Sequence, residues 1–87
     1  MTNKIDDILA ERGKRYGNFN TTAETAQYIK GGMRSNPEWQ HLKPSQIEAL
    51  EQIATKISRI IHGDPNYKDS WDDIAGYAQL ATEETTR

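Results

Sequence analysis

Residues 48–77 read EALEQIATKISRIIHGDPNYKDSWDDIAGY, and this stretch decides the fold. At about 100° per residue, its apolar side chains fall on one side of each of two helices and its polar side chains on the other. A Gly-Asp-Pro-Asn-Tyr turn separates the two patterns. The sequence therefore predicts two amphipathic helices that pack together. The side chains expected in the core or in a subunit interface are Leu50, Ile53, Ile57, Ile60, Trp71, Ile74 and Ala78.

Start and stop signals predict two more helices before this stretch. The first is expected to begin near Thr2 or Asn3 and to stop at Gly13 or Gly17. The second is expected after Thr21, which opens a Thr-x-x-Glu capping box. Both carry apolar residues at helical spacing, so each has one side to bury.

The same signals set the bounds of the helices in the second half. Residues 35–44 contain two prolines and are expected to form a loop that places Trp39 in the core. Ser45 is expected to open the next helix, because it forms a capping box with the glutamate three residues later. The last helix is expected to begin at Asp69 or Ser70. The imidazole at the end of the third helix, His62, is expected to cap its carboxyl end.

Length and composition predict a single all-α domain, residues 1–87, folded as a compact bundle of about four helices. A chain of this size buries only about 60 to 65% of its unfolded surface, so its own core is marginal. With 34% hydrophobic residues and no cysteine, neither a disulfide nor a thiolate metal site supplies extra stability. We therefore expect a homo-oligomer.

Net charge and hydropathy narrow the classes of partner that we expect for this protein. The formal net charge of −2 gives no reason to expect broad nucleic-acid binding, although local basic clusters can serve an anionic ligand. No apolar run approaches the roughly 18 residues of a membrane span, and the first residues lack the apolar region of a signal peptide. We expect a cytoplasmic protein without a membrane partner.

Three segments together resemble a known family. They are ERGKRYGNF near the start, EALEQIATKISRIIHGDPNY in the middle and DSWDDIAGYAQL towards the end. The combination resembles small proteins of unknown function encoded by bacteriophages and prophages, and this family looks like a compact relative of the MazG-like all-α nucleotide pyrophosphohydrolases. The resemblance implies a MazG-like helical fold, a nucleotide ligand and the cytoplasm of an infected bacterium.

The resemblance also implies a Mg²⁺ site. MazG-like enzymes hold Mg²⁺ with a Glu-x-x-Glu pair on one helix and a Glu-x-x-Asp pair on the next. The first pair corresponds to Glu48 and Glu51; the second corresponds to Asp69 and Asp72, where Asp replaces the usual Glu. Residues three apart project from one helical face, and hard cations prefer several oxygen ligands. Helix capping explains the same acidic residues, so Mg²⁺ is expected only if the protein is a hydrolase.

A second candidate site is an anion clamp. Lys56 and Arg59 share the polar side of one helix and are close enough to grip one phosphate group. The alternative is a surface ladder of i,i+3 and i,i+4 contacts. Gly76 favours a ligand, because glycine inside a helix costs about 1 kcal/mol relative to alanine and so suggests a close approach. Asp73, three residues earlier on the same side of the helix, and Tyr77, the next residue, join the predicted ligand-binding set.

The segment around Arg15 and Tyr16 interleaves cations with aromatic residues next to a glycine. Such a mixture can hold a phosphate through arginine while an aromatic ring stacks on a base. The alternative is that the aromatic residues only anchor the loop to the core. We include Arg15 and Tyr16 in the predicted ligand site.

Three functions follow, and whether the protein is an enzyme stays open. The first is capture of a phosphorylated nucleotide or nucleotide-derived signal without turnover, which would let a phage counter host defence. The alternative is a Mg²⁺-dependent MazG-like nucleoside triphosphate pyrophosphohydrolase, which needs an intact carboxylate cluster. A further alternative is a helical protein–protein interaction module. The sequence favours binding, because the predicted cations are present whereas the carboxylate cluster departs from the MazG pattern.

Overall fold

The computed structural model describes residues 4–85 and is all-helical over that range, which confirms the predicted fold class. Within these residues no helix combines the length and apolarity needed to cross a bilayer. The elements are α1 (Lys4–Tyr16), α2 (Phe19–Arg34), the 3-10 helix η1 (Pro37–His41), α3 (Pro44–His62) and α4 (Lys68–Thr85).

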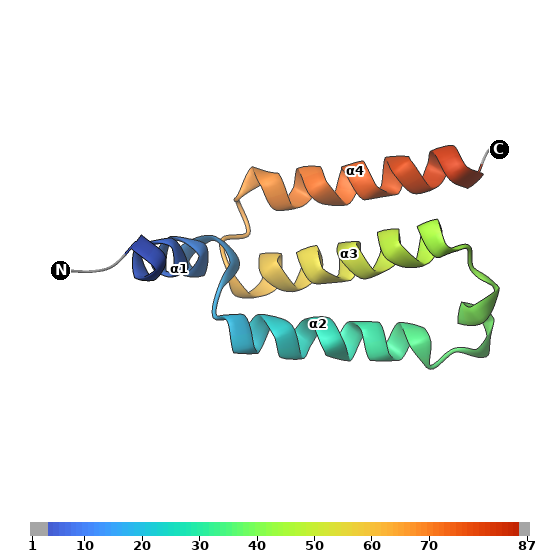
Figure 1. Ribbon diagram of the computed structural model, residues 1–87, viewed down its shortest axis with the longest axis horizontal. Helices are drawn as coiled ribbons and strands as arrows, with labels where there is room; N and C mark the ends of the chain where they lie inside the picture. The colour runs from blue at the N-terminus through green and yellow to red at the C-terminus, as the bar shows by residue number, and fades with distance from the viewer. Residues whose placement is uncertain (1–3, 86–87) are drawn as a thin grey trace.

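Three of the helices form a single layer (Figure 1). α3 is the central helix and packs against both α2 and α4, with its chain direction opposite to theirs. α1 stands at one end of this layer, where α3 ends and where α2 and α4 begin. The layer is therefore open on both of its broad sides, apart from the end that α1 reaches.

Two predicted helix starts are wrong by a few residues, because a different side chain caps each helix. α2 begins at Phe19, since Asn18 is its N-cap and accepts a hydrogen bond from the Thr21 backbone N–H at 3.2 Å. α3 begins at Pro44, where the Lys43 backbone N–H donates to the Gln46 side chain at 2.9 Å. The expected Ser45 capping box is therefore not the one that forms.

Other local predictions need smaller corrections. The stretch expected to be a loop, residues 35–44, contains the helix η1, whose start is capped by Asn36. Trp39 within it is only half-buried. α4 begins at Lys68, one residue before the predicted range. His62 lies in the last turn of α3, but its Nε2 is hydrogen-bonded to Thr25 of α2 at 2.7 Å, so it also links two helices.

The core of the layer is built from small side chains. The buried residues lie where α3 meets its two neighbours, and the Ser58 hydroxyl donates to the Thr22 carbonyl of α2. Small residues let helices approach closely, but they bury little apolar area. The buried residues are Thr22, Ala26, Ala49, Ala54, Ser58 and Ser70.

The predicted core side chains are largely outside this core. In the single chain Ile53, Ile60 and Ile74 are half-buried. The others are exposed, namely Leu50, Ile57, Trp71 and Ala78. The periodicity correctly identified an apolar side, but α3 is flanked by helices on its two edges, and no described element covers that side.

The two open sides of the layer differ in chemistry. α3 contacts α2 through Glu51 and Ser58 and contacts α4 through Lys56. At about 100° per residue these two sets lie on opposite edges of the helix, which leaves one strip free on each side. The apolar face is the side of the layer that carries Leu50, Ile57 and Ile61 of α3; the polar face carries Glu48, Gln52 and Arg59.

Candidate functional site

A backbone crossing positions the candidate site. Gly17 follows α1 with a φ of 85°, and a side-chain carbon there would overlap the carbonyl of His62. Gly63 follows α3, and a side-chain carbon there would overlap the backbone of Arg15 and Tyr16. The Asp64 backbone N–H donates to the Arg15 carbonyl at 2.9 Å. The end of α1 is thereby fixed on the end of α3 by main-chain contacts.

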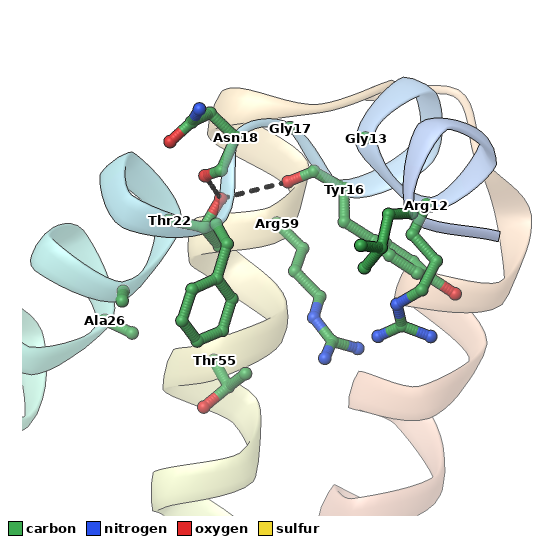
Figure 2. Close-up of a pocket in the computed structure, with 12 residues that line it drawn as sticks. Arg12, Gly13, Tyr16, Gly17, Asn18, Thr22, Ala26, Thr55 and Arg59 are labelled. Atoms are coloured by element: carbon green, nitrogen blue, oxygen red, sulfur yellow. Dashed lines mark hydrogen bonds between the residues drawn. The ribbon is translucent and has the colours of Figure 1, made fainter. Parts of the chain in front are cut away.

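Two arginines gather around Tyr16 at this crossing. The guanidinium carbon of Arg59 lies 4.6 Å from the centre of the Tyr16 ring, and that of Arg12 lies 5.0 Å from it. Figure 2 shows both guanidinium groups pointing the same way, out of the crossing. Arg59 comes from the polar face of α3, and Arg12 comes from α1 one helical turn before Tyr16.

A second aromatic ring extends the cluster. The rings of Tyr16 and Tyr67 meet edge to face with centroids 5.8 Å apart, and the Arg15 guanidinium carbon is 5.1 Å from the Tyr67 centroid. The Tyr67 hydroxyl donates to the Asp69 carboxylate at 3.0 Å, and this hydrogen bond raises the pKa of Tyr67 above its usual value. The phenol therefore stays protonated near neutral pH and acts as a donor. We call Arg12, Arg15, Tyr16, Arg59 and Tyr67 the arginine–tyrosine cluster.

The cluster borders a pocket of about 430 Å³ between α1, α2 and the polar face of α3. Much of its lining is apolar and includes Leu9, Phe19 and Ala26. Arg12 and Arg59 lie at the same pocket, and neither has a carboxylate within ion-pair distance among residues 4–85. The pocket thus combines an apolar wall with two cations whose charge is not neutralised by the described chain.

Lys56 has a different environment from the one predicted. Its ammonium group is 3.1 Å from the Asp73 carboxylate, and its side chain is only 14% exposed. It therefore joins α3 to α4 by an ion pair, and the contact observed for the Arg59 guanidinium is with the Tyr16 ring. Asp73 also lines a shallow groove on α4 with Gly76 and Tyr77.

Gly76 has no close neighbour in the described chain. A side-chain carbon built on it meets nothing within 4 Å. Packing against another helix of the same chain therefore does not explain a glycine in the interior of α4. The groove that it shares with Asp73 and Tyr77 lies on the polar side of the α3–α4 pair.

The four carboxylates predicted to hold Mg²⁺ are not brought together. Because the helices are antiparallel and Lys56 meets Asp73, Glu48 and Asp69 lie on opposite sides of this pair, about 18 Å apart along the axis at 1.5 Å per residue. Glu51 is paired with Arg34 at 2.8 Å and Asp72 with Lys68 at 2.7 Å; the latter contact raises the pKa of Lys68. Between residues 4 and 85 no group of three or more Asp, Glu, His or Cys side chains is placed to hold a metal.

The donor set therefore does not fit a bound Mg²⁺ ion in this arrangement. Glu48 is hydrogen-bonded to Gln52 at 2.9 Å, and Asp69 accepts from Tyr67. Each carboxylate has its own polar partner, so the observed roles are those of surface pairs and links between neighbouring elements. Hydrolysis stays a prediction that rests on the resemblance.

The structure adds residues that the sequence did not single out. Arg12 and Tyr67 belong to the arginine–tyrosine cluster although neither was a predicted site residue. Arg12 could have been found, because it precedes Tyr16 by four residues and a helix places such residues on one face. Tyr67 lies outside any helix, and its contact with Tyr16 depends on the crossing at the two glycines.

Comparison with known proteins places the chain in a family. Residues 2–85 match the family described as Domain of unknown function (DUF6378), so the chain belongs to this family. No curated protein and no solved structure matches it. Membership confirms the predicted assignment to a family of unknown function, and the family's description assigns no activity.

Proposed function

We propose that the protein binds a phosphorylated nucleotide or nucleotide-derived signalling molecule in the pocket beside the arginine–tyrosine cluster. The observation that supports this most is the pair Arg12 and Arg59, which share one aromatic ring and have no described carboxylate partner. Guanidinium groups are planar donors that suit phosphate oxygens, and their bonds to phosphate are stronger than neutral hydrogen bonds.

The pocket has a suitable size and lining for the rest of such a ligand. Small-molecule sites usually measure about 300 to 1,000 Å³ and are mostly apolar with a few polar groups. The pocket, at about 430 Å³, lies within this range. In the proposed complex the phosphates contact Arg12 and Arg59, and the base lies against the apolar wall at Phe19 and Ala26.

The other predicted ligand residues have supporting roles in this proposal. Arg15 holds Tyr67 against Tyr16, and Lys56 with Asp73 fixes α4 beside α3. A ligand with several phosphates can extend along the polar face from Arg59 towards Lys56, which lies three residues earlier on the same helix. Tyr77 lies further along that direction, in the groove with Gly76.

Capture without turnover is the proposed outcome of binding. Binding needs only the cations, donors and apolar wall described above, whereas hydrolysis needs a carboxylate cluster and a placed water. For a protein of phage origin, such capture would lower the free concentration of a nucleotide that the host uses in defence.

The test is to incubate the purified protein with nucleoside triphosphates, cyclic oligonucleotides and NAD-derived cyclic nucleotides, with and without Mg²⁺. Each ligand is analysed before and after the protein is denatured by heat. Capture predicts that one ligand disappears from free solution and returns intact on heating. Arg59→Ala should weaken binding by about 1.5 to 3 kcal/mol, the range for a hydrogen bond to a charged group.

Arg34→Ala is the matched control, because Arg34 is also on a helix surface but is paired with Glu51 far from the pocket. It should leave the affinity unchanged. Recovery of a monophosphate and pyrophosphate, dependent on Mg²⁺ and lost in Glu51→Gln, would replace capture by hydrolysis. If no member of the panel binds, the nucleotide proposal fails and a protein-binding module becomes the leading hypothesis.

A further inference from the structure

The apolar face of the layer is exposed and carries no charge at its centre. On α3 it presents Leu50, Ile57 and Ile61, all of them exposed in the single chain. At about 100° per residue, Trp71 and Ala78 of α4 fall on the same side, and both are exposed. Contiguous apolar patches of this kind on a protein surface mark interaction sites.

The chain exposes more surface than a compact monomer of its mass. Its accessible surface is 6370 Å² for 9.9 kDa. The usual scaling gives about 5,200 Å² for a folded monomer of that mass. The excess is larger than the roughly 800 Å² that each partner buries in a standard interface. The radius of gyration, 15.1 Å, likewise exceeds the roughly 12 Å expected for a compact chain of this length.

The shape of the apolar face fits a second copy of itself. Leu50, Ile57 and Ile61 form a ridge along α3. Beside this ridge, between α3 and α4, runs a groove of about 440 Å³ whose walls include the small residues Ala78 and Ala81. A ridge next to a groove is self-complementary under a two-fold axis, because each copy can place its ridge in the groove of the other.

We infer that the apolar face is the interface of a homodimer, in which the α3 ridge of each copy fills the α3–α4 groove of the other. None of the described residues that form the ridge or line the groove is charged, which disfavours an acidic or basic partner. The interface lies on the opposite side of the layer from the arginine–tyrosine cluster, so each pocket stays open. The inference is independent of the nucleotide proposal.

The experiment measures mass by light scattering over a range of concentrations for the wild type and two matched variants. Ile61→Asp changes a residue that is 61% exposed on the apolar face, and Leu80→Asp changes one that is 57% exposed on the polar side of α4. Both side chains are largely exposed in the single chain, so neither change should prevent folding. We expect a dimer for the wild type and Leu80→Asp, and a monomer of 9.9 kDa for Ile61→Asp at the same concentration.

Tryptophan fluorescence provides a second readout at the interface. In a Trp39→Phe background, Trp71 is the remaining tryptophan of the two in the chain. Its emission should shift to shorter wavelength as the protein concentration rises, because the dimer removes water from this face. The Ile61→Asp variant should abolish this shift.

Several results would overturn the inference. A wild-type monomer at all concentrations would remove it, as would a trimer or a dimer that survives Ile61→Asp. Dissociation by Ile8→Asp alone would assign the interface to α1, whose Ile8 is also exposed. Circular dichroism on every variant separates loss of the dimer from loss of the fold.

Discussion

The two open faces of the helical layer are made by the same helix but have opposite chemistry. The polar side of α3 supplies Arg59 to a cluster of cations and aromatic rings, whereas the apolar side presents an uncharged ridge of Leu50, Ile57 and Ile61. In the single chain neither side is fully covered. The comparison teaches that α3 is buried along its edges and presents a different surface on each broad side, which is why we propose an anion as the ligand of one side and a second copy as the partner of the other.

The largest expected effect comes from placing a charge on the apolar face. Ile57→Asp puts an unpaired carboxylate at the centre of the ridge, where association removes water from it. We expect the free energy of unfolding to fall by about 3 kcal/mol, which corresponds to a loss of more than about 10 °C in melting temperature for a chain of this size. Thermal denaturation monitored by circular dichroism measures the melting temperature.

Leu80→Asp is the control for this prediction, because it makes the same kind of change on the polar side of α4. It should alter the stability by no more than about 0.5 kcal/mol. If Ile57→Asp melts at the wild-type temperature, the two faces have been assigned the wrong way round.

The next largest effect tests the crossing that builds the polar-face site. Gly63→Ala forces a side-chain carbon against the backbone of Arg15 and Tyr16, and such overpacking costs about 1 to 3 kcal/mol. Gly76→Ala has open space and lies inside a helix, so it should stabilise the protein by about 0.5 to 1 kcal/mol. Urea denaturation of both variants gives the two values. Equal effects at the two glycines would show that the crossing does not constrain the chain.

A third prediction concerns the coupling of the two arginines that share Tyr16. For the tightest-binding nucleotide of the panel, Arg12→Ala and Arg59→Ala should each weaken binding by about 1.5 to 3 kcal/mol. The double variant should lose less binding free energy than the sum of the two single losses, because residues that contact one ligand group are not independent. Isothermal titration calorimetry on the wild type, the two single variants and the double variant measures these affinities. Strict additivity would place the two guanidinium groups on separate parts of the ligand.

The smallest effect is expected at Tyr67. Its pKa is raised, chiefly by the hydrogen bond that it donates to Asp69. A group with a raised pKa contributes stability that is present below its unfolded pKa, 10.0, and that is lost as the pH rises through the folded value. Tyr67→Phe should therefore reduce stability slightly at pH 8 and make no difference well above pH 10. Ultraviolet titration should show that the variant lacks a tyrosine whose pKa is raised; loss of a tyrosine whose pKa is not raised would contradict the assignment.

Helix content and the apolar side of the central helices could be predicted from periodicity. The partner of that side could not be predicted, because the periodicity at Leu50 and Ile57 is the same whether the partner belongs to the same chain or to another copy. Helix starts were missed where two capping patterns compete within a few residues, as at Asn18 against Thr21. Local sequence does not rank such neighbouring caps.

The candidate site was predicted in part. Tyr16 and Arg59 are brought into contact, although they are far apart in the sequence and were predicted from separate motifs. The predicted neighbour of Arg59, Lys56, is instead held by Asp73, because antiparallel packing sets a register that helix periodicity alone does not give. The same register separates Glu48 from Asp69, which no spacing rule within one helix could have shown.

The crossing of Gly17 and Gly63 has a consequence for the thermodynamics of recognition. The Tyr16 backbone is held by main-chain contacts and by the Thr22 hydroxyl, which donates to its carbonyl at 3.1 Å. Its ring is in contact with Arg12, Arg59 and Tyr67, so the ring is oriented in the chain without a ligand. A pre-organised binding surface loses little conformational entropy on association, so more of the contact energy is retained as affinity. A small domain with a marginal core can in this way offer a rigid recognition element, because the rigidity comes from backbone geometry and not from buried apolar area.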